Sequence, residues 1–298
     1  WARIKYLIPD NVMIENQTAP LPYVSIANGA WQNTDTWSNG SVQTIANSPS
    51  TVDPATFVDW NIVQTQHAVS SNGNKTLVGL IVTGNTLSAI NDTKIEVSHY
   101  LRLNGKIDLV GESQLIQTLN SDLDPTSSGS LEKDQQGTKV IYNYNFWCSP
   151  VGAMNNTTNN NSHTVNGVFK DGTTATPTDI NWVAGYDGSP TSPISLASYW
   201  IFKFQNASAN YSNWMSVGPN GTLTTAQGFT LKGSGSSLAD QNYTFLGKPN
   251  NGRVQFSIGG NLINLTGNPY SSALDAQAFI NANLASTDGT LYFWDHFG

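Results

Sequence analysis

Hydrophobic and polar residues alternate in the stretch Tyr100–Thr118, which reads YLRLNGKIDLVGESQLIQT. Both Leu101–Leu103 and Ile107–Leu109 follow a period of two, and Asn104-Gly105 separates them. Alternation of this kind predicts half-buried β-strands. Asn-Gly between two such strands is typical of a tight antiparallel hairpin, although it also suits a corner in a structure that repeats.

An upstream copy of the same pattern favours the repeating structure. Residues 82–84 match residues 103–105 at an offset of 21, and residues 87–95 match residues 107–115 at an offset of 20. A repeat of this length predicts a solenoid, and Asn and Gly at its corners supply positive φ angles. We therefore expect residues 77–118 to form stacked coils of a parallel β-helix, with a meander of antiparallel hairpins as the alternative.

The segments around these coils carry their own signals. A degraded third copy of the repeat covers about residues 61–79. Trp31 and Trp37 lie among small polar residues and suggest a plug over the open end of the solenoid, because an uncapped end exposes strand edges. Beyond residue 138, short strand candidates alternate with turn signals, as in an antiparallel sandwich or jelly roll. They include residues 228–232, 242–247, 253–258, 261–266 and a final strand over 290–294. Ser272–Asp275 predicts the start of one short helix.

These patterns predict an all-β fold, in which a short parallel β-helix is followed by an antiparallel β-sandwich or jelly-roll-like module with one short helix. Residues 1–27 are expected to end a preceding module or to form an N-terminal strand, and residues 28–121 to form the capped coils. Residues 122–138 are expected to be a linker or loop, and residues 139–298 the antiparallel module. Because the chain begins with tryptophan and stops directly after an apolar run, we expect a fragment or matured product of a longer protein, with its last module truncated.

Composition narrows the class of function. Charged residues make up 11% of the chain and the net charge is −7, whereas average soluble domains are about 25% charged. Nucleic-acid binders neutralise phosphates with basic patches, and the absence of any Lys/Arg cluster in the sequence argues against that class. No apolar run reaches the roughly 18 residues of a membrane-spanning helix. Abundant Asn, Thr, Ser and Gly with many aromatic residues is typical of an extracellular or cell-surface β protein.

Two sets of motifs resemble known families. The first is GAWQNTDTW, followed by DWNIV and the coils, and it resembles the opening segment of secreted right-handed β-helix proteins, which implies a right-handed coil. The second set comprises IDLVGESQLIQ, SSGSLEKDQQGT, YNYNFWCSPVG, SYWIFKFQN, QGFTLKGSG, YTFLGKPNNG, LTGNPYSSALDAQAFI and GTLYFWDH. It resembles very large secreted or cell-surface proteins of gliding Bacteroidetes, which usually end in a sorting domain read by the type IX secretion system. The resemblance runs from about Asn28 to His296 and brings no catalytic residues with it.

Carboxylates offer one kind of candidate site. Parallel β-helices often carry polysaccharide lyases and hydrolases, whose sites need carboxylates on one face. Asp92 and Glu112 occupy equivalent turns of successive coils, where they would bind a cation, act as acid and base, or simply be solvated corner residues, which we favour. Asp122, Asp124 and Asp134 lie in one polar loop whose oxygen atoms suit calcium. No other cofactor is expected, since none of the four histidines has metal-ligand spacing.

Aromatic residues offer a second kind of site. Trp182, Tyr186 and Trp214 fall near polar loops of the second module, where their rings would stack on sugars, with core packing as the alternative. Trp200 belongs to an alternating aromatic run and is expected in the core. Cys148 is the single cysteine, so it cannot form an internal disulfide, and we expect it to be a buried small hydrophobe.

One function and one alternative follow. We expect a non-enzymatic extracellular or cell-surface structural or adhesion protein, which forms part of a larger protein exported by type IX secretion. The alternative is a glycan-binding or polysaccharide-degrading β-helix protein. The expected partners are the type IX secretion machinery for the full-length parent, together with surface glycans or other outer-membrane proteins. Neither a nucleic-acid partner nor a membrane span is expected.

Overall fold

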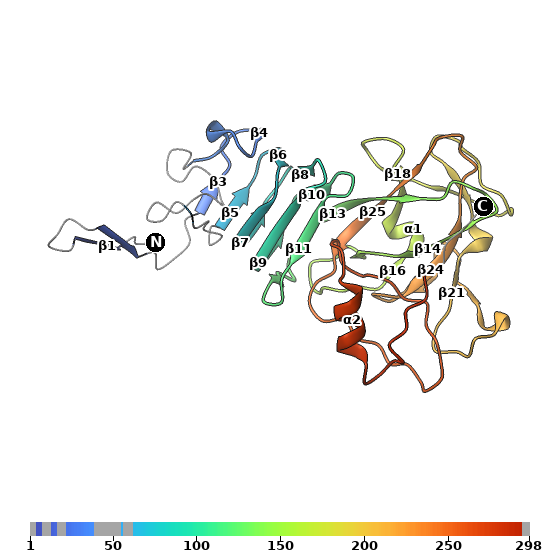
Figure 1. Cartoon of the computed structure of the whole chain (residues 1–298). Coiled ribbons are helices and arrows are strands. Elements are labelled where there is room, and N and C mark those ends of the chain that lie inside the picture. The colour runs from blue at the N-terminus through green and yellow to red at the C-terminus, as the bar shows by residue number, and fades with distance from the viewer. Residues whose placement is uncertain (1–3, 8–12, 17–21, 39–54, 56–61, 294–298) are drawn as a thin grey trace. The chain divides into compact units, whose positions relative to one another are not determined.

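The computed structural model describes residues 4–7, 13–16, 22–38, 55 and 62–293, and Figure 1 shows its strands and helices. The chain divides into two compact units, Trp1–Ser130 and Leu131–Gly298, which we call unit 1 and unit 2. Strands account for 40% of the structure and helices for 8%, with a β-solenoid of about four turns. The predicted fold class, a β-helix followed by a mostly antiparallel module with a short helix, is therefore confirmed.

Unit 1 begins with a two-stranded hairpin and continues along the chain as a stack of parallel strands. The hairpin pairs β1 (Ile4–Leu7) with β2 (Met13–Asn16). One sheet of the solenoid contains, in spatial order, β11 (Gln114–Gln117), β9 (Lys94–Leu103), β7 (Lys75–Val82), β5 (Ile62–Thr65) and β3 (Pro22–Val24), with β12 (Asp122–Leu123) also on β9. A second face stacks β10 (Lys106–Leu109), β8 (Thr86–Ile90), β6 (Val69–Asn72) and β4 (Gly29–Ala30). Each pairing within these two stacks is parallel.

The strand register confirms the coils. Val82 pairs with Leu103, Leu87 pairs with Ile107, and both pairs match the repeat found in the sequence. The degraded third copy is also real, because β5 and β6 pair in parallel with β7 and β8. Asn104 and Gly105 form a corner, where both backbone N–H groups donate to the carbonyl of Val82. The hairpin alternative is therefore wrong.

Apolar side chains of successive coils stack inside the solenoid. Leu80 pairs with Leu101, and Leu101 pairs with Leu123 in the next coil. All three side chains are buried. Alternate residues of each strand point to the same face, and paired residues of neighbouring strands therefore point to the same side of the sheet. Burial of each leucine contributes about 1.5–3 kcal/mol, so the repeated alternation itself supplies the core of unit 1.

Polar side chains at the corners bind the backbone of an adjacent coil. Asn74 Oδ1 accepts from the N–H of Lys94 at 3.0 Å. Ser113 Oγ accepts from the N–H of Thr93 at 3.2 Å. Backbone groups at corners have no partner in the parallel ladder, and an unpaired buried group is costly. The Asn and Ser content of the chain therefore has a structural use within unit 1.

The boundaries of unit 1 differ from those expected. Residues 1–27 were expected to end a preceding module or to form an N-terminal strand, and the coils to begin at residue 28. The first rung of the solenoid instead begins at residue 22, because β3 pairs in parallel with β5 and β4 with β6. After this rung, η1 (Thr34–Thr36) precedes Trp37, whose indole N–H donates to the carbonyl of Trp31. Both indoles are buried, edge to face at 5.0 Å. Asp59 and Trp60 of the DWNIV motif lie outside the described residues.

Residues 122–138 are more ordered than the expected linker. They contain β12 and all of β13 (Ser130–Gly137), a strand whose sequence is largely charged and amide-bearing. β13 exists because Leu131–Gly137 pairs with Gln241–Gly247 in an antiparallel ladder. A partner strand more than a hundred residues away thus outweighs the local polarity of the segment.

Unit 2 is built from short strands that pair mostly in antiparallel fashion. β25 (Gln241–Pro249) lies between β13 and β17 (Phe169–Asp171), β17 also pairs β18 (Thr178–Asp179), and β15 (Val151–Gly152) pairs β25. Two-stranded sheets pair β14 (Tyr144–Cys148) with β24 (Gly228–Lys232), β16 (His163–Thr164) with β23 (Thr222–Leu223), and β21 (Phe202–Lys203) with β22 (Met215–Ser216). β19 (Asn181–Val183) and β20 (Ser195–Ala197) form a parallel pair. The helices are α1 (Val165–Val168), η2 (Ser198–Trp200), η3 (Tyr211–Asn213) and α2 (Ala276–Asn283).

An inner aromatic core holds unit 2 together. It comprises the buried side chains of Trp147, Phe169, Phe229, Tyr243 and Phe245. The ring of Phe169 stacks on Tyr243 at 5.0 Å and meets Phe245 edge to face at 5.0 Å. Offset and edge-to-face pairs of this kind add about 0.5–1.5 kcal/mol beyond burial.

Several expected elements of unit 2 differ in the structure. The expected strands over 253–258 and 261–266 are absent, while the strands over 228–232 and 242–247 are present within β24 and β25. The helix is also present, and it begins after Asp275, whose side chain accepts from the N–H of Ala278. Residues 290–293 of the expected final strand are irregular, and Trp294 lies outside the described residues.

Candidate functional site

A second set of aromatic side chains lies on the opposite face of β14 from the inner core. Asn145 and Trp147 of this strand are buried, whereas Tyr144 and Phe146, which alternate with them, are half-buried. Rings from η2, β21 and neighbouring loops join these two. We call the set the outer aromatic cluster; its members are Tyr144, Phe146, Tyr186, Tyr199, Trp200, Phe202, Phe204 and Trp214.

Thr230 of β24 attaches the η2–β21 segment to this face. Its hydroxyl donates to the carbonyl of Trp200 at 2.7 Å and accepts from the N–H of Phe202 at 3.1 Å. Thr230 is paired with Phe146 across the β14–β24 ladder, and opposite residues in such a ladder point to one side. The two hydrogen bonds therefore place Trp200 and Phe202 over the same face as Tyr144 and Phe146.

Ring contacts run through the whole cluster. Trp200 meets Tyr144 at 5.8 Å and Tyr199 at 4.7 Å, both edge to face. Tyr186 adds a further contact to Tyr199 at 4.9 Å. At the other end, Trp214 meets Phe146 at 6.4 Å. Tyr186 is 63% exposed and Tyr199 is 48% exposed, so this continuous set of rings reaches solvent.

Lys232 places a positive charge on the cluster. Its Nζ lies 3.6 Å from the ring centroid of Trp200 and 4.9 Å from that of Tyr144, and Lys232 is the cross-strand neighbour of Tyr144. Such cation–π contacts are favourable by about 0.5–2 kcal/mol. Burial against the rings lowers the pKa of Lys232, and the Asp187 carboxylate partly offsets this. Among the described residues, the ammonium has no hydrogen-bond or ion-pair partner, so its N–H donors face solvent.

The sequence-predicted aromatic residues are only partly brought together. Tyr186 and Trp214 both belong to the outer aromatic cluster. The indole of Trp182 instead donates to Asn166 Oδ1 at 2.9 Å. Trp200, expected in the core, is half-exposed within the cluster. Lys232 was missed, and the available signal was its place at the end of an apolar strand, opposite an aromatic one.

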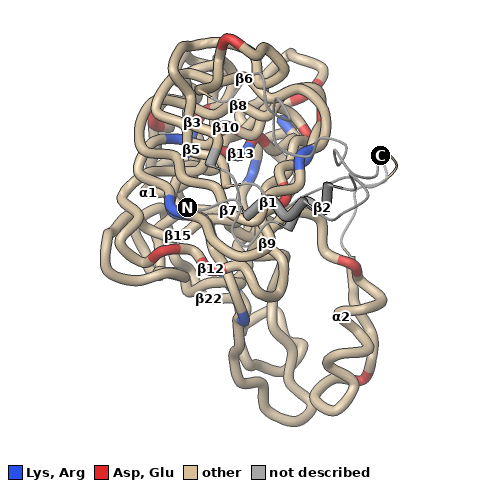
Figure 2. The backbone as a smooth tube through the Cα atoms, turned by 90° about the vertical axis from the view of Figure 1, so that its left-hand side faces the viewer, with Lys and Arg blue, Asp and Glu red and all other residues tan. Residues whose placement is uncertain are grey.

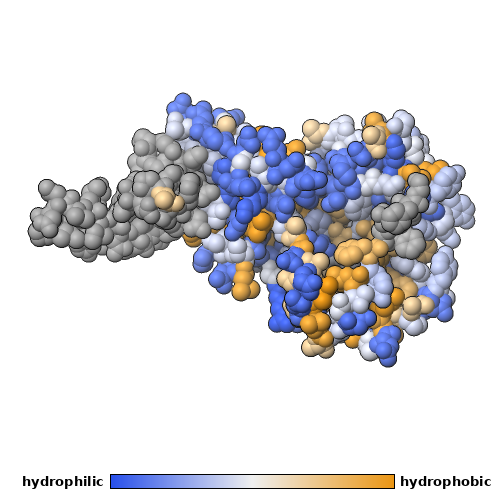
Figure 3. All heavy atoms as spheres, viewed as in Figure 1, coloured by the Kyte–Doolittle hydropathy of each residue, from blue (hydrophilic) through white to orange (hydrophobic). Residues whose placement is uncertain are grey.

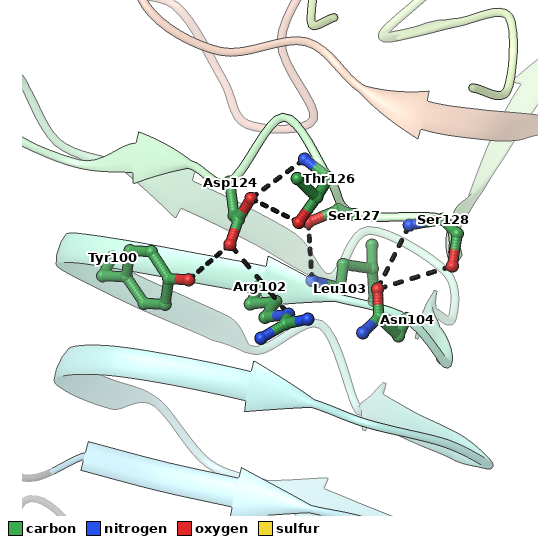
Figure 4. Close-up of polar contacts among 8 residues, drawn as sticks. All are labelled: Tyr100, Arg102, Leu103, Asn104, Asp124, Thr126, Ser127 and Ser128. Carbon is green, nitrogen blue, oxygen red and sulfur yellow. Dashed lines mark hydrogen bonds and ion pairs between the residues drawn. The ribbon is translucent and has the colours of Figure 1, made fainter. Parts of the chain in front are cut away.

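A polar network closes the last coil of unit 1 around Asp124 (Figure 4). Asp124 Oδ2 accepts from the hydroxyl of Tyr100 at 2.6 Å, and Oδ1 accepts from the hydroxyl and the N–H of Thr126 at 2.7 and 2.9 Å. Arg102 Nε lies 4.0 Å from Oδ2. The bond from Tyr100 and the two from Thr126 lower the pKa of Asp124 to about 2. The carboxylate thus stays ionised and anchors the loop that follows β12.

Comparison with protein families assigns the chain to one family. A family model described as Domain of unknown function (DUF8693) matches residues 23–298. The chain belongs to this family. No curated protein and no solved structure matches it. The DUF8693 match begins within β3, so it includes the first rung of the solenoid and all of unit 2.

The three aspartates expected to bind calcium have separate roles in the DUF8693 chain. Asp124 is engaged by its own loop, and Asp122 is exposed on β12. Asp134, on β13, accepts from Thr244 at 2.9 Å and from Asn242 at 3.2 Å. Within the described ranges, no group of three or more His, Cys, Asp or Glu side chains is placed to hold a metal ion.

Two buried titratable groups of unit 2 lie apart from these sites. Burial lowers the pKa of His163 to about 4, and the backbone of Asn161 offsets this shift only in part. Burial raises the pKa of the Cys148 thiol to about 12, although the residue as a whole is half-buried. The thiol is thus protonated at neutral pH and unreactive, as expected for a small hydrophobe.

Charge and hydropathy distinguish the surfaces of the DUF8693 chain. Figure 2 shows Lys, Arg, Asp and Glu scattered along the chain rather than gathered in one place. On the face shown in Figure 3, apolar residues gather around α2, where Leu274 and Leu284 are exposed. In the part of the chain that the structure covers, no helix combines the length and apolar character that crossing a membrane requires. The outer aromatic cluster is the best-defined candidate because it combines exposed rings with a fixed charge.

Proposed function

We propose that this protein is a non-enzymatic structural or adhesion protein that acts outside the cell or at its surface. The observation that carries the proposal is the outer aromatic cluster, with Tyr186 and Tyr199 exposed beside Trp200. Exposed aromatic rings of this kind are enriched at surfaces that bind partners, since they bury a large area with little loss of side-chain entropy.

The inner aromatic core supports this interpretation by contrast. Trp147 already packs on the side of β14 that faces Phe169 and Tyr243, so the fold of unit 2 has its core without the outer rings. Leaving a set of rings half-exposed sacrifices burial that a purely structural protein would gain. Contact with an external partner recovers that loss.

Unit 1 suits the role of a spacer. Its parallel coils bind one another through backbone ladders and through corner side chains such as Asn74 and Ser113. Stacked repeats of this kind resist shape change because each coil contacts its neighbours along its whole length. In the proposed role, unit 1 is the support and unit 2 carries the adhesive surface.

Export is the second part of the proposal. The low charge of the chain and its resemblance to large secreted proteins of gliding Bacteroidetes support passage through the type IX secretion machinery as part of a longer protein. Detection of the parent protein in culture medium or on the cell surface, and its loss from both in a strain lacking that machinery, would test this part. Persistence of the protein at the surface of such a strain would contradict it.

An adhesion assay tests the function itself. The whole chain, immobilised on beads, is expected to retain cells or polysaccharide surfaces, and the double variant Tyr199→Ala/Trp214→Ala to retain at most about a tenth as much, because each aromatic hot spot contributes about 2 kcal/mol or more. Tyr142→Ala is the matched control, since Tyr142 is 74% exposed and lies outside the cluster.

Two results would count against the proposal. Equal retention by the parent and the double variant would remove the outer aromatic cluster from the adhesive surface. Release of soluble products from any polysaccharide incubated with the chain would show an enzyme instead.

A further inference from the structure

We propose that the outer aromatic cluster binds carboxylated glycans, with the Lys232 ammonium meeting the carboxylate and the neighbouring rings packing on the sugar faces. This inference rests on the proposed adhesion function and names the ligand class of the same surface. Three observations support this inference. The Lys232 ammonium is held in place, the rings beside it are exposed, and it is a positive charge on a chain whose net charge is −7.

Lys232 is held in place before any ligand arrives. Lysine side chains normally lose considerable rotamer freedom when they bind, but here the ring faces of Trp200 and Tyr144 already confine the Nζ. The Trp200 ring is itself fixed by its indole N–H, which donates to the carbonyl of Tyr186. An ammonium confined in this way, with its donors toward solvent, is suited to an acidic oxygen.

The rings beside Lys232 suit a pyranose better than a peptide. A sugar ring has an apolar C–H face and a polar rim of hydroxyls, so it needs flat apolar surfaces bordered by hydrogen-bonding groups. Tyr199 and Tyr186 supply exposed rings that carry their own hydroxyls. Aromatic-lined grooves also bind proline-rich peptides, but proline rings and peptide groups offer no carboxylate to Lys232.

The charge of the chain makes this position selective. With a net charge of −7, the protein repels polyanions in general, so an acidic glycan binds only where a cation is locally dominant. Asp187 is the carboxylate that acts electrostatically on Lys232, and no ion pair among the described residues joins the two. Lys232 therefore remains open to an external carboxylate.

The test compares acidic glycans with neutral copies of themselves. Polygalacturonate and alginate are offered to the whole chain alongside the same polymers after reduction of their carboxyl groups, and affinity is measured by gel electrophoresis or calorimetry. We expect the acidic forms to bind at least about tenfold more tightly, because the charge-assisted hydrogen bond to the ammonium forms only with a carboxylate. We also expect this preference to shrink as salt is added.

Three variants locate the effect. Lys232→Met should abolish the preference for the acidic form, and Lys232→Arg should keep most of it because arginine retains the charge and the ring contact. Arg253→Met removes the same charge from an exposed position outside the cluster and should change nothing. Circular dichroism confirms that each variant is folded, and should Lys232→Met fail to fold, Lys232→Gln, which removes the charge and keeps a polar end, takes its place and should lose the preference in the same way.

The outcomes separate this inference from the function on which it rests. Equal binding of acidic and reduced polymers, lost in Tyr199→Ala/Trp214→Ala, would overturn the carboxylate preference and leave adhesion intact. Adhesion only to protein-coated surfaces, with neither form of glycan bound, would overturn the ligand class alone. Failure to adhere to any surface would overturn both.

Discussion

Asp92 Oδ1 accepts a hydrogen bond from the backbone N–H of Glu112, 2.9 Å away and one coil later. The two carboxylate residues thus interact through one side chain and one backbone group, rather than as a pair of acids. Asp92 lies in the left-handed region with φ of 54°, a conformation that short polar residues such as Asn and Asp tolerate best. The corner is a structural device, with Asp92 as its acceptor.

Substitutions of Asp92 test this role. Asp92→Ala should destabilise unit 1 by roughly 2 kcal/mol, because the acceptor is lost and alanine is strained at positive φ. Asp92→Asn keeps both the acceptor and the tolerated conformation and should melt within a degree or two of the parent, as should Glu112→Gln. Thermal melts followed by circular dichroism measure the difference. A chelator that lowered the melting temperature of the parent, but not that of Asp92→Asn/Glu112→Gln, would show instead that the corner holds a cation.

Leu101 tests the stacked interior. It is buried between Leu80 and Leu123, so Leu101→Ala should cost about 2–5 kcal/mol through lost burial and the cavity left behind. Arg102→Ala, at the adjacent position on the opposite face, should cost less than about 1 kcal/mol. Urea denaturation of the two variants gives the comparison. Similar midpoints for both would contradict the assignment of inner and outer faces.

Tyr100 tests the electrostatics of the last coil. Its hydroxyl is the strongest influence that lowers the pKa of Asp124 to about 2. A carboxylate whose pKa is lower in the folded than in the unfolded chain stabilises the fold at pH values above the unfolded pKa, which is near 4. This stabilisation disappears as the pH falls toward 2, and Tyr100→Phe should make the loss smaller. The pKa of Asp124 should rise toward its ordinary value in an NMR titration. Thr126→Ser, which keeps the hydroxyl, serves as the control, and an unchanged pKa in Tyr100→Phe would refute the assignment.

His163 gives a pH dependence of opposite chemical origin. Its imidazole is buried in the neutral form with a pKa of about 4, so the unfolded chain binds the proton more readily. Stability should therefore fall as pH drops from about 6.5 toward 4, by up to roughly 3 kcal/mol. His163→Leu should flatten this slope, whereas replacement of the exposed His99 by Gln should leave it in place. An unfolding free energy of the parent that stays constant over this pH interval would rule out the buried neutral imidazole.

Local repetition made the solenoid predictable. Leu87 and Ile107 occupy equivalent places in two copies of one pattern, and the structure pairs them. Their alternation predicts which side chains point inward, and the Asn and Gly residues between strands predict the corners. Everything needed for these conclusions lies within about 20 residues of sequence, which is why they held.

Prediction from local alternation failed in segments whose strands depend on long-range pairing. Residues 130–137 read as a polar loop, yet Lys133 pairs with Phe245 and Gln135 with Tyr243 in a regular ladder. Residues 253–258 alternate as a strand would, yet they form none in the structure. Strand formation in unit 2 depends on a partner distant in sequence, and the alternation of one segment carries no information about that partner.

The outer aromatic cluster could not be predicted from the sequence, because it also depends on contacts between distant segments. Tyr186 and Trp214 were proposed together with Trp182, but the sequence did not show the ring contacts that join them through Trp200, Tyr144 and Phe146. These contacts exist because Thr230 anchors the η2–β21 segment across β24. A single sequence shows the aromatic residues, but not which of them face one side of one sheet.

The register of the corner hydrogen bonds limits how unit 1 can change length. Asn74 reaches Lys94 and Asp92 reaches Glu112, so each bond spans 20 residues. Insertion of a single residue into a strand would turn every following side chain to the other face, whereas duplication of a whole 20-residue coil would reproduce all of its contacts. The solenoid can therefore act as a ruler graduated in steps of about 4.8 Å, which evolution can lengthen or shorten by copying or deleting one graduation at a time.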